Sequence, residues 1–222
     1  MYVPVIHTMG DLGSLAEHVS KRGVSDLGED IWQEHLKIVN GFWDSLELYF
    51  SSVDVRGIKI YQDGMIVEGA WGEKIIEEGV KAGSKNYALV SKLLRRGGVL
   101  VKTEDFNLVK QERDKLVALT QAKTIIRKLF SAIKYKWVKS RLLNQRDEFI
   151  AKRIAETLNP DEKAILFIGA SHNVKSRLPK DILVNDVKDI ERVKEYHRLL
   201  LFGHIDKQRF NEFGRYLTSK VV

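Results

Sequence analysis

The chain contains no cysteine, so neither disulfide bonds nor thiolate chemistry contributes to its structure or activity. A bound metal ion would have to be held by histidine, aspartate and glutamate side chains. The lack of cysteine suits a reducing compartment, and we expect a cytoplasmic protein. No apolar run approaches the roughly 20 residues of a membrane-spanning helix, and no basic segment precedes an apolar one at the amino terminus. We therefore expect neither a membrane span nor a signal peptide.

Proline is also scarce, and each of the 3 prolines falls where the helix or strand pattern begins or stops. Pro4 suits the start or edge of a strand, because proline cannot donate a hydrogen bond to a neighbouring strand. Pro160 follows a long helical pattern and is expected to end it. Pro179 precedes an apolar segment. The chain has no internal repeat or linker that would divide it, and we expect one domain spanning residues 1–222.

The composition is that of a globular protein, with 44% hydrophobic and 30% charged residues. The net charge of +7 serves solubility in one interpretation. In another it attracts an anionic partner such as nucleic acid, a phosphate ester or a membrane surface. The oligomeric state is not determined by these features.

Strand-like and helical patterns alternate along the chain, which predicts an α/β fold with a mostly parallel central sheet of about five strands flanked by helices. The strands are expected at residues 2–8, 55–62, 99–103, 164–168 and 182–187. A long helix is expected before the fourth strand, over residues 122–158. Helical insertions would occupy residues 106–158, and a pair of helices, residues 189–219, would end the chain.

Polar residues follow the predicted strands, and right-handed crossovers would bring these strand ends to one edge of the sheet. They are His7, Asp63, Glu104 and His172, with Asp186 less clearly placed. Gly169 and Ser171 lie in the small-residue turn before His172, where backbone can approach a ligand closely. An alternative is that each polar residue only caps its strand or starts the next helix, as Asp11 and Asp105 do in that interpretation.

If His7, Glu104 and His172 converge, two kinds of site are open. The three side chains form an acceptable ligand set for zinc, manganese or iron, although no local HExxH spacing supports a metal. Alternatively, one histidine is a general base that a carboxylate orients.

Arg146 recurs with Ile150 and Ile154 at helical spacing and therefore points toward the buried face of its helix. A buried arginine needs a partner, which would be a carboxylate such as Glu104 or Asp147, or a bound anion. The alternative is an arginine at the edge of an exposed face.

The helical segment 123–153 is rich in lysine and arginine, with Phe130, Tyr135 and Trp137 among them. Such a segment can bind nucleic acid or an anionic surface, and Lys134, Lys136 and Lys139 would then matter. It can equally be a solvated face with aromatic residues turned inward.

The segment RDEFIAKRIAETLNPDEKAILFIGASH, residues 146–172, resembles the TraB/pheromone-shutdown branch of the erythromycin-esterase and ChaN-like superfamily. That family has an Arg-Asn pair opening a helix and a later Gly-x-x-His at a strand end. Arg146-Asp147 and Gly169 to His172 match these motifs, apart from Asp147 in place of asparagine. The family's early Gly-x-x-His would fall on Pro4 to His7, where the histidine matches and the glycine does not.

The resemblance implies hydrolase activity, since members with demonstrated activity are hydrolases and some are metal-dependent peptidases. Glu104 would correspond to the family's strand-end glutamate. We therefore expect a hydrolase, with or without a divalent metal, acting on a small-molecule or peptide substrate that is partly anionic. The expected catalytic residues are His7, Glu104, Arg146 and His172, and the expected substrate-binding residues are Asp11, Asp63, Asp147, Gly169 and Ser171. A non-catalytic binding protein and a small-molecule sensor remain alternatives.

Overall fold

The computed structural model describes residues 1–120, 125–201 and 206–221, and side chains outside residues 12, 14, 15, 115–139 and 201. The predicted roles of Lys134, Lys136 and Lys139 lie outside the described side chains. No helix among the described residues is both long and apolar enough to cross a bilayer.

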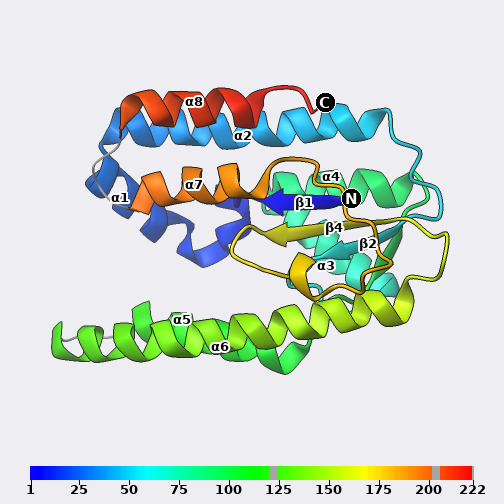
Figure 1. The fold of residues 1–222 in the computed structure, drawn as a ribbon. Helices are drawn as coiled ribbons and strands as arrows, with labels where there is room; N and C mark the ends of the chain where they lie inside the picture. The colour runs from blue at the N-terminus through cyan, green and yellow to red at the C-terminus, as the bar shows by residue number, and fades with distance from the viewer. Residues whose placement is uncertain (121–124, 202–205, 222) are drawn as a thin grey trace.

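The fold is α/β with a parallel sheet flanked by helices, as the sequence predicts (Figure 1). In the described chain the sheet has four strands, with the spatial order β1-β4-β2-β3. They are β1 (Tyr2–Val5), β2 (Lys59–Gln62), β3 (Val99–Val101) and β4 (Ala164–Gly169). β4 is therefore central, between β1 and β2.

The predicted fifth strand at residues 182–187 is wrong. Asp186 forms a single isolated bridge with Tyr2. The backbone exchanges two hydrogen bonds with Tyr2, through the carbonyl of Asn185 and the amide of Val187. Ile182 and Val184 pack partly buried against a hydrophobic core and Leu183 is 88% exposed, so the segment lacks continuous pairing with β1 rather than an apolar face. The segment touches the free edge of β1 and then turns into a helix.

The helices connect the strands and cover both faces of the sheet (Figure 1). A 3-10 helix, η1 (Met9–Leu15), and a shorter one, η2 (Lys175–Arg177), follow β1 and β4. The α-helices are α1 (Ala16–Leu27), α2 (Glu29–Ser51), α3 (Gly69–Lys81), α4 (Lys85–Arg95), α5 (Phe106–Thr120), α6 (Ile125–Thr157), α7 (Ile190–Leu201) and α8 (Lys207–Thr218).

The start of the first helical segment differs from the prediction, because Thr8 rather than Asp11 is the N-cap. The Asp11 carboxylate reaches back to the Thr8 amide and to the Thr8 hydroxyl, 2.8 Å away, in a capping box. It also accepts a hydrogen bond from the Ser84 hydroxyl, which ties η1 to the start of α4. Asp11 therefore has a structural role in this fold.

Side chains of one strand alternate between two hydrophobic cores. Val3, Ile60 and Phe167 point to the larger core, which α2, α4, α7 and α8 cover. Tyr61 and Leu166 point the other way, into a smaller core beneath α6. This alternation follows from the two-residue period of a strand and explains why β4 is apolar on both faces.

The buried stripe of α6 continues past its apolar residues into charged ones. Ile154, Ile150 and Arg146 follow one another at four-residue spacing, and Ala151 and Asp147 lie beside them. All five side chains are at most 7% exposed. Because α6 runs opposite to the strands, the charged end of this buried stripe, Arg146 and Asp147, lies over the carboxyl ends of the strands.

Ile150→Ala should lower the free energy of unfolding by about 2–5 kcal/mol, because Ile150 is fully buried between α6 and the sheet. Denaturant unfolding measures the change. Glu148→Ala, on the exposed side of the same helix, is the control and should change stability by less than about 0.5 kcal/mol. Equal effects in both variants would contradict this packing of α6.

Candidate functional site

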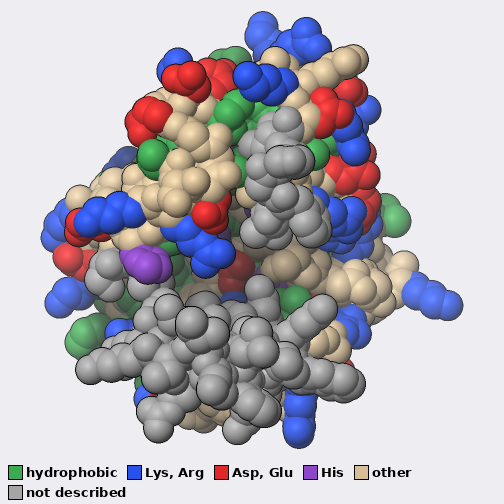
Figure 2. All heavy atoms as spheres, turned by 90° about the vertical axis from the view of Figure 1, so that its left-hand side faces the viewer, with side chains coloured by type: hydrophobic (Ala, Val, Ile, Leu, Met, Phe, Trp, Pro, Cys, Tyr) green, Lys and Arg blue, Asp and Glu red, His purple; other side chains and the backbone are tan. Residues whose placement is uncertain are grey.

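The strand order places the carboxyl ends of β2, β3 and β4 next to one another, beneath Arg146 and Asp147 of α6. Asp63 follows β2, Glu104 lies beyond β3 and His172 lies beyond β4. Figure 2 views this edge of the molecule, and the surface there is hollowed near its centre, with acidic side chains visible inside the hollow.

Arg146 is the centre of the first part of the site. Its Nε donates to both carboxylate oxygens of Glu104, at 3.2 and 3.1 Å, and its Nη2 also contacts Glu104. Nη2 donates to Asp63 Oδ1 at 2.7 Å, and Nη1 donates to Glu112 of α5. One guanidinium therefore joins three carboxylates, a group that we call the Arg146 cluster.

The Arg146 cluster has three carboxylates and one guanidinium, and this excess of negative charge favours a carboxylate that keeps its proton. Glu104 is fully buried, and burial raises its pKa. Hydrogen bonding to Arg146 lowers the pKa of Glu104, and the negative charge of Asp63 raises it. Together with burial, these effects bring the pKa of Glu104 to about 7. The pKa of Arg146 is raised above its usual value, because its bonds to the carboxylates outweigh its burial. Arg146 thus keeps its charge, and Glu104 titrates near neutral pH.

His172 is the centre of the second part and connects Asp147 to the Arg146 cluster. Its Nδ1 lies 2.6 Å from Asp147 Oδ1, and its Nε2 lies 3.6 Å from Asp63 Oδ2. The other oxygen of Asp147 accepts the backbone amide of Asn173 at 2.9 Å, which fixes the carboxylate. Nδ1 is therefore the nitrogen held by Asp147, while Nε2, beyond hydrogen-bond distance of Asp63, can act on another molecule.

The two carboxylates shift the protonation of His172. Burial by itself lowers the pKa of His172, but the hydrogen bond to Asp147 and the charge of Asp63 together outweigh it, and the pKa is raised. For Asp63, burial raises the pKa, while the charges of His172 and Arg146 outweigh burial and lower it. The weaker positive influence of His7 acts in the same direction on Asp63.

Gly169 lets β4 approach Asp63 closely. Its backbone amide donates to Asp63 Oδ2 at 3.0 Å. A Cβ at this position would lie 3.1 Å from the same oxygen, which is tighter than ordinary van der Waals contact. The glycine that the sequence suggests for substrate binding thus holds a carboxylate of the site through its backbone.

A cleft of about 190 Å³ adjoins His172. It lies between the loop after β4, the side chain of Tyr2 and the first residues of α7, including Lys194. The site therefore has an open space next to the histidine as well as a buried network of charges behind it.

The structure brings together most, but not all, of the residues that the sequence suggests. Glu104, Arg146, Asp147, His172, Asp63 and Gly169 are joined by the contacts given above. His7 lies two residues beyond β1 with its side chain exposed, and no hydrogen bond joins that side chain to another described residue. Ser171 is exposed in the turn before His172.

The predicted metal ligands do not form a metal site. In the part of the chain that the structure describes, no group of three or more histidine, aspartate and glutamate side chains is arranged to hold an ion. Of the predicted ligands, Glu104 is bound to Arg146, and His172 uses Nδ1 for Asp147. The described residues therefore do not fit the divalent ion that was one of the two possibilities left open by the sequence.

Two residues of the site were not predicted from the sequence. Glu112 lies in the charged run QERDK of α5, where its neighbours look equally suited to solvent. Tyr2 belongs to the first strand, and its aromatic ring gives only a signal for core packing. Neither carries a local pattern that would distinguish it.

Neither a protein-family model, nor a curated protein sequence, nor a solved structure matches this chain. The resemblance to the TraB/pheromone-shutdown branch stays a prediction.

Arg146→Met should destabilise the fold by about 3–5 kcal/mol, because three buried or half-buried carboxylates lose their common cation. Without the arginine their pKa values rise in the folded state, so the loss of stability should be larger at pH 8 than at pH 5. Denaturant unfolding at both pH values measures it. Arg141→Met, on the exposed side of α6, is the control. A pH-independent loss would show that the charges are not coupled.

Asp147→Asn should lower the pKa of His172, because it removes the carboxylate at Nδ1 and keeps the shape of the side chain. NMR titration of the histidine ring protons measures this shift. The raised pKa of His172 stabilises the folded state fully below its ordinary value of 6.5, and this stability is lost as pH rises through the folded pKa. The stability difference between wild type and Asp147→Asn should therefore be larger at pH 6 than at high pH. An unchanged pKa would contradict the pairing.

Proposed function

We propose that this protein is a hydrolase in which His172 transfers protons between water and substrate at the carboxyl edge of the sheet. The observation that carries the proposal is the position of the His172 imidazole. Asp147 holds Nδ1, Nε2 is not committed to a hydrogen bond, and the ring lines a cleft. An orienting carboxylate, a histidine and an open space beside it are the elements of general acid–base catalysis.

In the proposed reaction neutral His172 accepts a proton at Nε2 from the water that attacks the substrate. Asp147 keeps the proton of the neutral ring on Nδ1 and stabilises the imidazolium that forms. Asp63, 3.6 Å from Nε2, adds a second negative charge beside that imidazolium. The imidazolium then returns the proton to the leaving group.

Arg146 acts as a positioning residue in this proposal. The sequence left open whether its partner is a carboxylate or a bound anion, and its contacts are with Glu104, Asp63 and Glu112. Its charge is already balanced by carboxylates, and this argues against a second anion. Arg146 supports the proposed reaction because it holds Asp63 next to His172. Glu104, with a pKa of about 7, gives the cluster a group that exchanges a proton near neutral pH.

Hydrolysis should depend on His172. The wild-type protein would be assayed against panels of aryl esters, lactones and small peptides, with His172→Ala and His172→Gln measured beside it. Loss of a general base predicts a fall in kcat/KM of about 10²–10⁴-fold. His18→Ala is the control, since His18 is exposed on α1. Thermal unfolding of every variant separates loss of activity from loss of fold.

The pH profile gives a second readout. Only neutral His172 is a base, and its pKa is raised, so kcat/KM should rise with pH through a pKa above 6.5. Asp63→Asn removes one of the charges that raise it and should move the rise to lower pH. A folded His172→Ala variant with wild-type rates would contradict the proposal. So would a pH profile that Asp63→Asn does not change.

A further inference from the structure

The cleft beside His172 contains a polar group that the proposed proton transfer does not use. Tyr2 is only 2% exposed, yet its side chain lines the cleft. No hydrogen bond joins its hydroxyl to any other described residue. Burial, followed by the negative charges of Asp147, Asp186 and Asp63, raises the pKa of Tyr2, so the hydroxyl stays protonated. A hydroxyl with no hydrogen-bond partner among the described residues, on a side chain that lines a cleft, is a donor available to a ligand.

The charged groups around the cleft have both signs. Lys175 and Lys194 provide positive charge, and Asp186, Asp189 and Glu191 provide negative charge. Lys175 pairs with Asp186, and Lys194 pairs with Glu191, each at 2.7 Å. These pairs are partly exposed, and such pairs contribute only about 0–1 kcal/mol, so a charged ligand can replace either partner at small cost.

The amino end of α7 is already occupied and does not define the ligand. The Asp189 side chain accepts the backbone amides of Glu191 and Arg192, at 2.8 and 3.2 Å. The recognition chemistry of the cleft therefore comes from side chains. An anion alone would meet three carboxylates, and a cation alone would meet two lysines. A ligand that carries both charges meets neither conflict.

The size of the cleft limits the ligand further. Its volume of about 190 Å³ corresponds to roughly six water molecules. This space suits a group the size of an amino acid or a very small peptide.

We infer that the cleft formed by Tyr2, Lys175, Asp186 and Lys194 binds a small zwitterionic group, the amino-acid moiety of a peptide or amino-acid derivative, and presents it to His172. In this arrangement Tyr2 donates its hydroxyl hydrogen to the ligand. Lys194 and Lys175 attract the ligand carboxylate, and Asp186 with Glu191 attracts its ammonium group. The inference rests on the proposed function in one respect, since it makes His172 the reactive neighbour of the bound group.

Calorimetric binding to the full chain tests the inference with three matched probes: glycylglycine, N-acetylglycylglycine and glycylglycinamide. Glycylglycine should bind, and the two blocked peptides, each lacking one charge, should bind at least about tenfold more weakly. Equal binding of all three probes, or no binding of glycylglycine at millimolar concentration, would overturn the inference.

Variants locate the binding. Tyr2→Phe keeps the ring and removes the hydroxyl, and should weaken glycylglycine binding about threefold to tenfold. Lys194→Gln should weaken it while leaving the affinity for glycylglycinamide unchanged. Lys180→Gln, an exposed lysine outside the cleft, is the matched control. Binding that neither Tyr2→Phe nor Lys194→Gln alters would place the peptide elsewhere and refute the assignment.

The same experiment keeps this inference apart from the proposed hydrolysis. If glycylglycine binds through Tyr2 and Lys194, but neither it nor any other substrate class is cleaved, the proposed hydrolysis is refuted and the zwitterion site stands. If His172 cleaves uncharged esters but no probe binds in a charge-dependent way, the proposed hydrolysis stands and the zwitterion site is refuted.

Discussion

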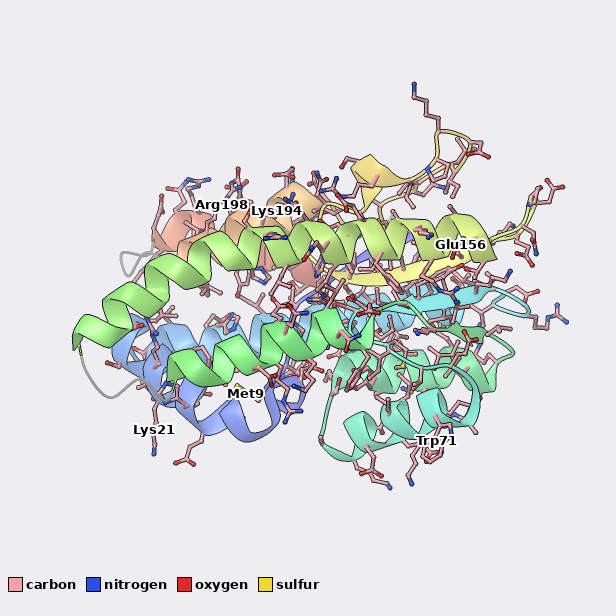
Figure 3. All side chains as sticks on the ribbon, turned by 90° about the horizontal axis from the view of Figure 1, so that it is seen from below. Met9, Lys21, Trp71, Glu156, Lys194 and Arg198 are labelled. Atoms are coloured by element: carbon pink, nitrogen blue, oxygen red, sulfur yellow. The ribbon has the colours of Figure 1, made fainter. Side chains whose placement is uncertain are left out.

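The Arg146 guanidinium is the constraint on which the rest of the site depends. It is 7% exposed and joins Asp63, Glu104 and Glu112, which come from three different segments of the chain. The charged form of Glu104, which is fully buried, depends on this cation, because an unpaired buried charge costs several kcal/mol. The arginine therefore links the ends of β2 and β3 to the helical pair α5 and α6, which lie side by side (Figures 1 and 3).

One helix connects this structural constraint with the chemistry. Arg146 and Asp147 are adjacent in α6, yet they serve different partners, since Arg146 binds the carboxylates and Asp147 binds His172. Both side chains continue the stripe that packs Ile150 and Ile154 on the sheet. The position of the histidine is thus determined by the same helix packing that forms the smaller core.

The sequence predicts the class of fold and several members of the site for physical reasons that are visible locally. Apolar runs indicate buried strands, and helical spacing places Arg146 on a buried face, where it needs a carboxylate. The order of the strands is not a local property, so contact between Asp63 and Gly169 could not be derived. Glu112 looks like any exposed glutamate of a helix. The segment 182–187 has the composition of a strand, but only its contact with Tyr2 forms a bridge.

The position of β4 has a consequence for how the protein is made. β1 pairs only with β4 in the sheet, so the first strand to leave the ribosome has no neighbouring strand until residues 164–169 have been synthesised. Contacts between such distant segments form slowly, because a long loop must close first. His172 follows within three residues of that closing strand. Completion of the sheet and assembly of the histidine site are therefore one event, and a partly synthesised chain has neither.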